Sequence, residues 1–457
     1  MKNDFLNKDT IIAPISGLSG GSVHLIRVSG PEAINITSRF FSNKNFKKGE
    51  KNRFFYGKLV NEQNELIDDV IVLLYKKPHS YTGEDMVEIS CHGNLLITEQ
   101  IIELFLRNHC RLAEPGEFTK QAFLNGKIDL VQAESIASII SARSEKALQN
   151  AIKQLEGSFS LEIKSIRDNL VKAISLLELN LDFAEEDIEV IEDEQVLTLI
   201  EEIIRKIDRY LNSYQQGKLL LNGVKVLITG KPNVGKSSLM NALLEKDRVL
   251  VSEIPGTTRD FVHDEIYLEN VLVKFIDTAG IRISSDEIEK EGIRRAEQLF
   301  DEVDLILFLF DASRTLDRED FYLIDRLKDF KEKVRYLANK IDLAFLEENL
   351  KHLNDRPLIK ISAKEKINIE QIKNEIKNLI HTTDKQEVIV NNERQYQLLK
   401  QAKQRLLEAK RTLQKQVGHE FVAMELREVI NLLLEITGEI TNEDILKNIF
   451  SHFCIGK

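Results

Sequence analysis

The chain has 457 residues, 42% of them hydrophobic and 30% charged, which is enough for about three soluble domains with apolar cores of their own. Its net charge of −11 argues against a protein that coats RNA or DNA by bulk electrostatics. The sequence has no apolar run of about 18 residues and no apolar N-terminal segment, so neither a membrane span nor a signal peptide is expected. Its three scattered cysteines (Cys91, Cys110 and Cys454) predict a reducing, cytoplasmic setting.

The first part of the chain, residues 1–118, alternates short apolar runs with turn residues, which predicts an α+β domain. Strands are expected at 24–30, 68–75 and 86–93. The helical spacing of apolar residues over 97–108 predicts a helix that covers the sheet.

The next part, residues 119–221, has the periodicity of long amphipathic helices. Its apolar residues recur at intervals of three to seven over 130–155 and, after Gly157, over 161–181. The acidic run 184–194 is expected to lie exposed at a helix boundary, and a further helix is expected to end near residue 214.

A linker at 215–218 (QQGK) is expected to lead into the next domain, residues 222–380. Strand and helix signals alternate in this domain, which predicts a mostly parallel, doubly wound sheet. The predicted strands are 224–229, 271–277, 303–311, 334–340 and 357–363.

The helical pattern returns over residues 381–457, so the α/β domain is inserted between helical segments. Basic residues between Lys400 and Lys415 are expected to form a solvated helix face, with nucleic-acid contact as the less favoured alternative. The sequence therefore predicts a multidomain protein of α/β and α+β class.

Residues 230–237 read GKPNVGKS, a complete phosphate-binding loop between an apolar strand and a helix-like segment. Its glycines let backbone N–H groups curl around the phosphates, and the helix N-terminus adds a favourable dipole. Lys236 is expected to reach the β- and γ-phosphates, and the Ser237 hydroxyl is expected to bind Mg²⁺.

Three further elements follow in the order of a GTP-binding domain. Asp277 ends a predicted strand and is expected to hold the water shell of Mg²⁺, while the Gly280 N–H meets the γ-phosphate. The Asp342 carboxylate can accept hydrogen bonds from guanine N1–H and N2–H₂, which adenine cannot match, and Asn339 would brace that loop. A backbone donor in 362–364 (SAK) can meet guanine O6, so the series of motifs selects GTP over ATP.

The segment 252–260 (SEIPGTTRD) is expected to be a first switch, in which a threonine caps Mg²⁺ only while a γ-phosphate is present. Thr258 is the first choice for this role and Thr257 the nearest competitor, and a plain turn at Pro255 is the alternative interpretation. Ile281 stands near the position where Ras-like enzymes place a water-orienting Gln, and its side chain cannot do that.

The group that orients the attacking water must then come from elsewhere. The carboxylates of 284–289 are candidates, although a solvated helix start is the simpler interpretation of that segment alone. Arg259 and Arg282 are candidates for positive charge near the bridging oxygens. The residues expected to contact GTP or its metal ions are Asn233, Val234, Gly235, Lys236, Ser237, Ser238, Ser252, Glu253, Ile254, Pro255, Gly256, Thr257, Thr258, Asp277, Thr278, Ala279, Gly280, Asn339, Lys340, Asp342, Ser362, Ala363 and Lys364.

The nucleotide motifs, together with GTTRD at 256–260, resemble those of the translation-factor-related bacterial GTPases. Segments outside the nucleotide domain narrow this resemblance to the MnmE (TrmE) family of tRNA-modification GTPases. They are 80–85 (SYTGED), 115–118 (PGEF), 122–130 (AFLNGKIDL) and 453–457 (FCIGK). The resemblance covers essentially the whole chain.

The resemblance implies an N-terminal domain, 1–118, that forms a homodimer and binds 5-formyl- or 5,10-methylene-tetrahydrofolate. It implies a helical domain built from 119–221 and 381–457, with the GTPase domain, 222–380, inserted within it. The family acts with the FAD-binding protein MnmG on the wobble uridine of certain tRNAs. It adds a carboxymethylaminomethyl or aminomethyl-type group at C5, with the one-carbon unit from folate, and its paired GTPase domains use K⁺ in place of an arginine finger.

The resemblance also assigns metal ligands residue by residue. Asn233 matches the K⁺ ligand of the phosphate loop, and Ser237 and Thr258 match the Mg²⁺ ligands. Glu289 matches the glutamate that orients the attacking water through a bridging water, so Glu289 and Lys236 are the expected catalytic residues. The remaining K⁺ contacts come, largely through backbone carbonyls, from the loop that contains Ser252, Ile254 and Thr257.

A folate site is implied in the same way, and Cys454 matches the terminal cysteine of the family. One departure affects this site: residues 14–24 (PISGLSGGSVH) replace the stretch richer in Pro and Gly that is usual in the family, which alters the expected wall of the pocket. The positions that match folate contacts are Arg27, Glu88, Lys127 and Lys457.

Two other functions compete with this one. A ribosome-assembly GTPase switch of the Era/EngA type would carry a basic RNA-binding module, which the acidic chain and its FCIGK ending argue against. A folate-dependent carrier with an idle GTPase is disfavoured by the complete nucleotide motifs. The sequence predicts a cytoplasmic GTPase, and the resemblance implies that it is a homodimer that acts in tRNA modification.

Overall fold

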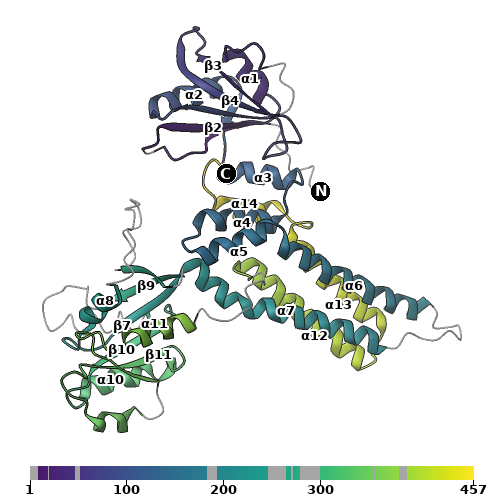
Figure 1. The fold of residues 1–457 in the computed structure, drawn as a ribbon. Coiled ribbons are helices and arrows are strands. Elements are labelled where there is room, and N and C mark those ends of the chain that lie inside the picture. Colours follow the sequence, from purple (N-terminus) through teal and green to yellow (C-terminus); the bar gives the residue numbers. More distant parts are fainter. Residues whose placement is uncertain are drawn as a thin grey trace. The chain divides into compact units, whose positions relative to one another are not determined.

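The computed structural model describes residues 9–18, 20–46, 52–182, 193–244, 264–268, 271–277, 299–353, 357–379 and 389–457 (Figure 1). The chain forms two compact units. The first comprises Met1–Ala137, Ile152–Arg205 and Leu398–Lys457, and the second comprises Ser138–Ala151 and Lys206–Gln397. The predicted α/β and α+β class is confirmed, while the domain limits drawn at residues 118, 221 and 380 remain a prediction.

The first unit contains a six-stranded sheet in the order β3-β4-β5-β2-β1-β6, antiparallel except for the parallel pair β1 and β6. Helices α1 (Ala33–Phe40) and α2 (Leu95–Arg107) bury apolar side chains in a common core with strand residues of this sheet. The predicted strands and helix of this part are confirmed within two residues. The strands are β1 (Thr10–Pro14), β2 (Val23–Ser29), β3 (Arg53–Val60), β4 (Leu66–Tyr75), β5 (Met86–His92) and β6 (Cys110–Leu112).

The second face of this sheet is apolar at β3 and β4. In β4, Val70 and Val72 are buried, whereas Ile71 between them is 44% exposed, because successive side chains point to opposite faces. Ile71 pairs with Tyr56 of β3, which is 66% exposed, and Phe54 is 74% exposed. Three large apolar side chains thus lie on solvent-facing strands.

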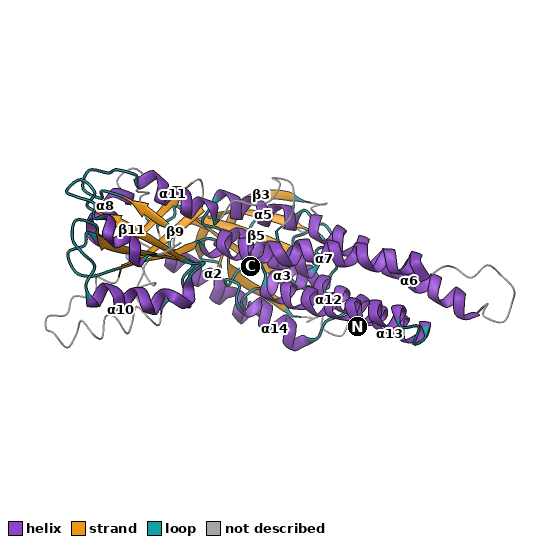
Figure 2. Cartoon of the chain, turned by 90° about the horizontal axis from the view of Figure 1, so that it is seen from below, coloured by secondary structure: helices purple, strands orange, loops and turns teal. Residues whose placement is uncertain are grey.

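The first unit also contains helices α6 and α13, which pack along one another (Figures 1 and 2), while α4, α5, α7 and α12 each have residues in both units. Gly157, with φ of +87°, separates α5 from α6 as its position in the periodic pattern predicts. Residues 184–192 of the predicted acidic run lie outside the described residues. The helices are α3 (Glu117–Leu124), α4 (Leu130–Ser141), α5 (Glu145–Leu155), α6 (Ser158–Asp182), α7 (Asp193–Asn222), α12 (Glu393–Gln414), α13 (His419–Thr437) and α14 (Glu443–Ser451).

The predicted linker at 215–218 is wrong, because α7 continues through it to Asn222. Gly217, which suggested a break, is helical. A Cβ atom at this position would lie 2.1 Å from the carbonyl oxygen of Val390. The glycine therefore permits close packing of the 389–391 segment against α7, and it does not end the helix.

The segment that follows the second unit's sheet is bonded to residues of α5 and α7 that belong to the same unit. Asn150 of α5 bonds both the carbonyl oxygen and the N–H of Ile389, each at 2.9 Å. The Val390 N–H donates to the Ser213 hydroxyl of α7 at 3.1 Å. The entry helix and the exit segment of the α/β domain therefore run in direct contact.

The second unit contains the α/β sheet, in the order β12-β11-β10-β7-β9-β8. Its pairs are parallel except for the edge strand β8, which is antiparallel to β9 and was not predicted. In β7, Ile228 and Leu227 belong to two different core clusters, as expected for a strand covered on both faces. The strands are β7 (Val224–Thr229), β8 (Asp264–Leu268), β9 (Val271–Asp277), β10 (Leu305–Asp311), β11 (Val334–Asn339) and β12 (Leu358–Lys360), with helices α8 (Lys236–Leu244), α10 (Arg318–Arg326) and α11 (Ile369–Asn378) and 3₁₀ turns Leu327–Phe330 and Glu347–His352.

Two basic residues of α12 form ion pairs with carboxylates of other helices. Arg405 lies 3.2 Å from Glu425, and Lys410 lies 2.8 Å from Glu201. These ion pairs favour the solvated helix face over the nucleic-acid alternative.

In the part of the chain that the structure describes, every helix is too short or too polar to cross a membrane. All three cysteines are free thiols. Cys91 and Cys110 are buried, and burial raises the pKa of the Cys110 thiol to about 12, whereas Cys454 is exposed.

Candidate nucleotide site

The phosphate loop joins the end of β7 to the start of α8, and its backbone demands glycine at two points. Gly230 has φ of +145°, and a Cβ atom there would lie 2.1 Å from the Leu309 carbonyl oxygen. Gly235 has φ of +104°, and a Cβ atom would lie 2.3 Å from Nδ2 of Asn339. Since α8 begins at Lys236, the loop leads directly into a helix N-terminus, the geometry that suits a phosphate group.

Polar side chains of the loop occupy defined places around this turn. The Lys236 ammonium donates to the carbonyl oxygens of Gly230 at 2.7 Å and Lys231 at 2.8 Å, so it lies across the loop. Ser237 and Ser238 are exposed in the first turn of α8. Asn233 is exposed and has a left-handed backbone conformation at φ of +62°.

Asn339 joins three of the predicted motifs. It ends β11, is 2% exposed, and its Nδ2 donates to the Val234 carbonyl oxygen at 2.7 Å. Its Oδ1 accepts from the Ala363 N–H at 2.9 Å. One buried amide thus connects the phosphate loop, the 339–342 loop and the 362–364 loop, while Asp342 remains exposed.

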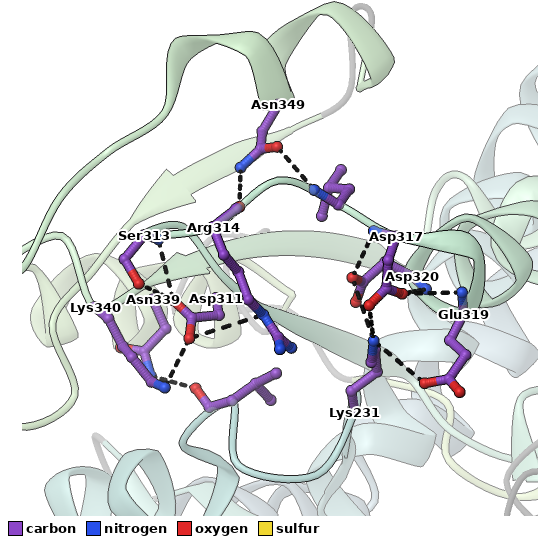
Figure 3. A network of polar contacts seen from close by, with 12 residues as sticks. Lys231, Asp311, Ser313, Arg314, Asp317, Glu319, Asp320, Asn339, Lys340 and Asn349 are labelled. Atoms are coloured by element: carbon purple, nitrogen blue, oxygen red, sulfur yellow. Dashed lines mark hydrogen bonds and ion pairs between the residues drawn. The ribbon is translucent and has the colours of Figure 1, made fainter.

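Lys340 is held by a residue that the sequence did not single out (Figure 3). Its ammonium lies 2.8 Å from Oδ2 of Asp311, which ends β10, and Asp311 Oδ1 accepts from the Ser313 N–H at 3.0 Å. Burial raises the pKa of the Asp311 carboxyl, but hydrogen bonds from Lys340 and Ser313 outweigh burial and lower it. Strand pairing places Asp311 beside Asn339, and knowledge of this register would have identified it.

Several predicted contacts fall outside the described residues. They comprise the whole first switch, the residues after β9 and the expected catalytic carboxylate. Asp277 ends β9 as predicted, although its side chain is not described. Those outside are Ser252, Glu253, Ile254, Pro255, Gly256, Thr257, Thr258, Thr278, Ala279, Gly280 and Glu289.

A second polar site lies in the N-terminal sheet, where strand register pairs Arg27 of β2 with Glu88 of β5. Arg27 Nε donates to Glu88 Oε1 at 2.9 Å, and both side chains are largely buried. The guanidinium carbon lies 4.7 Å from the centroid of the Tyr81 ring and 5.4 Å from that of Phe118. The sequence alone indicated no role for these two aromatic residues, although Tyr81 lies in the SYTGED segment and Phe118 lies in the PGEF segment.

The other two predicted folate residues make main-chain contacts. The Lys127 ammonium donates to the Pro78 carbonyl oxygen at 3.0 Å. The Phe118 N–H donates to the main-chain oxygen of Lys457 at 3.1 Å. Gly456, at φ of +97°, approaches Pro14 so closely that a Cβ atom would lie 2.3 Å from its carbonyl oxygen. The chain's last residues therefore pack beside Phe118 and β1.

Comparisons with known proteins place the chain in a family. Residues 10–127 match a family model described as the GTP-binding protein TrmE N-terminus, and residues 130–454 match one described as the MnmE helical domain. The chain is 41% identical over 451 residues to the tRNA modification GTPase MnmE of Cytophaga hutchinsonii, covering 98% of both chains. It is 40% identical to the protein of the same name from Aquifex aeolicus, covering 98% of this chain and 100% of the other.

Solved structures match the chain over shorter stretches. The G domain of the T. maritima FeoB iron transporter is 27% identical, covering 35% of this chain and 99% of that one with a TM-score of 0.27. Aquifex aeolicus Era bound to GDP and AlF₄⁻ is 25% identical, covering 40% and 66% with a TM-score of 0.28. Two matching family models and relatives of about 40% identity over nearly the full length show that the chain belongs to the MnmE family of tRNA modification GTPases.

Proposed function

We propose that this GTPase acts with an FAD-binding partner of the MnmG kind to modify C5 of the wobble uridine in certain tRNAs, with a one-carbon unit from tetrahydrofolate. Family membership supports the role of a tRNA modification GTPase. The observation that best supports GTP as the nucleotide is the buried Asn339 amide, which joins the phosphate loop to both loops expected at the guanine base. The partner and the folate chemistry rest on the family resemblance and on the Arg27–Glu88 site.

For the nucleotide, we propose that Lys236 contacts the β- and γ-phosphates and that Ser237 and Thr258 bind Mg²⁺. Asn233 would bind K⁺, which supplies positive charge beside the phosphates. Asn233 and Ser237 are both exposed and carry side-chain oxygen atoms, which are the ligands that hard cations such as Mg²⁺ prefer. Glu289 would orient the attacking water.

For the folate, we propose that the Glu88 carboxylate accepts hydrogen bonds from the amidine-like edge of the pterin ring. Arg27 holds Glu88 in place, and the partly exposed Tyr81 ring beside Arg27 offers a flat surface to a flat heterocycle, while the fully buried Phe118 ring packs against the guanidinium. Tyr75 O–H also approaches Glu88 Oε2 at 3.5 Å, so the carboxylate is restrained from two sides. Lys127 and Lys457 would meet the negatively charged parts of the cofactor.

We also propose a homodimer through the N-terminal domain and a cytoplasmic location. The exposed side chains of Phe54, Tyr56 and Ile71 form an apolar strip on β3 and β4 that a second copy could cover. In the part of the chain that the structure describes, no membrane-spanning helix is found.

The experiment that tests this function compares tRNA nucleosides by mass spectrometry in a deletion strain complemented with different variants. The wild type is expected to restore the C5-modified wobble uridine, and Glu88→Gln to leave it below about a tenth of that level, because one acceptor becomes a donor at the pterin edge. Glu103→Gln, an exposed carboxylate of α2, is the matched control and should restore modification. An unchanged nucleoside profile in the deletion strain would reject the tRNA role. Full restoration by Glu88→Gln would reject this folate site alone.

A monovalent cation effect is expected on GTP hydrolysis. If K⁺ binds at Asn233, phosphate release should be at least several-fold faster in KCl than in NaCl at matched ionic strength. The reason is that carbonyl oxygens of the 252–257 loop are expected to suit the larger K⁺ ion. Asn233→Ala should remove most of this difference. Stopped-flow phosphate release measures both, and equal rates in the two salts for the wild type would contradict the cation mechanism.

A further inference from the structure

The residue after the first glycine of the phosphate loop makes a set of ion pairs that the nucleotide motifs do not require (Figure 3). The Lys231 side chain is only 10% exposed and extends to the start of α10, a segment about 86 residues later in the chain. Its ammonium donates to Asp317 and lies 3.2 Å from a Glu319 oxygen and 3.8 Å from an Asp320 oxygen. One lysine of the loop is thus surrounded by three carboxylates.

These carboxylates are fixed by the helix that bears them. Asp317 is the N-cap of α10, and its Oδ1 accepts from the N–H groups of Glu319 and Asp320 at 3.0 and 3.3 Å. Asp320 Oδ2 in turn accepts from the Asp317 N–H at 3.1 Å, which completes a capping box. Asp320 is buried, so the nearby ammonium offsets a charge that would otherwise be costly to desolvate.

The ion pair is charged throughout the physiological pH range. The hydrogen bond from Lys231 lowers the pKa of the Asp317 carboxyl to about 2. Burial lowers the pKa of the Lys231 ammonium, but hydrogen bonds to Asp317 and Glu319 outweigh burial and raise it. Both partners are therefore charged at neutral pH.

The same residue also sets the place of Lys236. The main-chain oxygen of Lys231 accepts from the Lys236 ammonium at 2.8 Å, beside the Gly230 oxygen at 2.7 Å. A shift of residue 231 would therefore move one of the two acceptors that locate the ammonium expected at the β- and γ-phosphates. The opposite side of the loop is fixed by the Asn339 amide at Val234.

We infer that Lys231 is a positioning residue for GTP binding and hydrolysis, which ties the first bend of the phosphate loop to the N-terminus of α10 and so fixes the acceptor site of Lys236. The inference rests on the proposed nucleotide site. The competing explanation is that Lys231 acts as one more positive charge that attracts the phosphates. The two explanations predict opposite effects of an Asp317 substitution on the affinity for GTP.

The test measures the dissociation constant of GTP by calorimetry for Lys231→Met, Asp317→Asn and the double variant. If Lys231 positions the loop, Lys231→Met should weaken binding roughly 10-fold and Asp317→Asn about 3-fold or more, because each loses a charge-assisted hydrogen bond. The double variant should bind about as weakly as Lys231→Met, since both changes break one contact. If Lys231 attracts the phosphates by charge, Asp317→Asn should instead strengthen binding, and that result would overturn the inference.

Three further variants complete the design. Lys231→Arg keeps a cation that the carboxylates can bind, and it should recover most of the affinity. Lys328→Met is the matched control, because it removes an exposed lysine paired with Asp325 near the same helix, and it should bind GTP as the wild type does. Lys236→Ala reports on the site itself: unchanged binding there would reject the proposed nucleotide site. Loss of binding in Lys236→Ala with wild-type affinity in Lys231→Met would reject the positioning role alone.

Discussion

Replacing Asp342 with asparagine should weaken GTP binding by roughly 5- to 150-fold, the equivalent of ~1–3 kcal/mol for a mismatched hydrogen-bonding group. We expect the carboxylate to accept two hydrogen bonds from the guanine N1–H and N2–H₂ groups. In the variant one acceptor becomes an NH₂ donor that faces a donor. Asp342 is exposed in the structure, so the change should not disturb a core.

Calorimetry with GTP and XTP makes this test specific to the base. Xanthine carries an oxygen acceptor at C2 in place of the amino group, so Asp342→Asn should gain XTP affinity as it loses GTP affinity. Asp329→Asn is the matched control, because this residue lies in the 3₁₀ turn Leu327–Phe330, away from the 339–342 loop. If Asp342→Asn bound GTP as tightly as the wild type, the proposed base contact would be wrong.

Replacing Glu289 with alanine should lower the rate of GTP hydrolysis about 100-fold or more while GTP affinity stays near that of the wild type. A positioned group that takes part in proton transfer or orients the attacking water commonly contributes ~10²–10⁴ to the rate. Ile281 can supply no such function, so the chain needs a carboxylate or a group from outside. Single-turnover phosphate release in KCl, with GTP affinity measured separately, distinguishes the effect on chemistry from an effect on binding.

Glu287→Ala is the matched control, because it removes a carboxylate from the same acidic segment, two residues away. It should hydrolyse GTP at close to the wild-type rate. If Glu289→Ala also kept the wild-type rate, the water-orienting role proposed for Glu289 would be wrong.

Much of the α/β sheet was predictable because local sequence patterns mark where its strands begin and end. Strands β7 and β9 match the predicted ranges to the residue, since each is an apolar run that ends at a motif. The edge strand β8, at Asp264–Leu268, was missed because its short run mixes polar and apolar residues. Gly217 was misread because glycine breaks helices when only local preference is considered. Its contact with Val390 depends on tertiary packing, which overrides that preference.

The motif residues of the nucleotide site could likewise be named from the sequence, since each has a fixed place in a local pattern. The residues that hold these motif residues in place could not be named from the sequence. The contact of Lys231 with Asp317 joins segments 86 residues apart, and Asp311 supports Lys340 from a neighbouring strand. Such partners are set by strand order and register, which no short motif specifies. The same holds for Tyr81 and Phe118, which meet Arg27 only after folding.

The contact between α7 and the 389–391 segment bears on how the α/β domain could be inserted into, or removed from, a helical protein. Where Gly217 meets Val390 and Asn150 bonds Ile389, the polypeptide enters and leaves the α/β domain at neighbouring points. A domain with adjacent ends can be gained or lost in a single genetic event, because the remaining chain needs only a short loop to close the gap. Splicing residue 222 to residue 389 through a few glycines should accordingly leave a helical scaffold with its original path, and the excised piece would carry both of its own ends on one side.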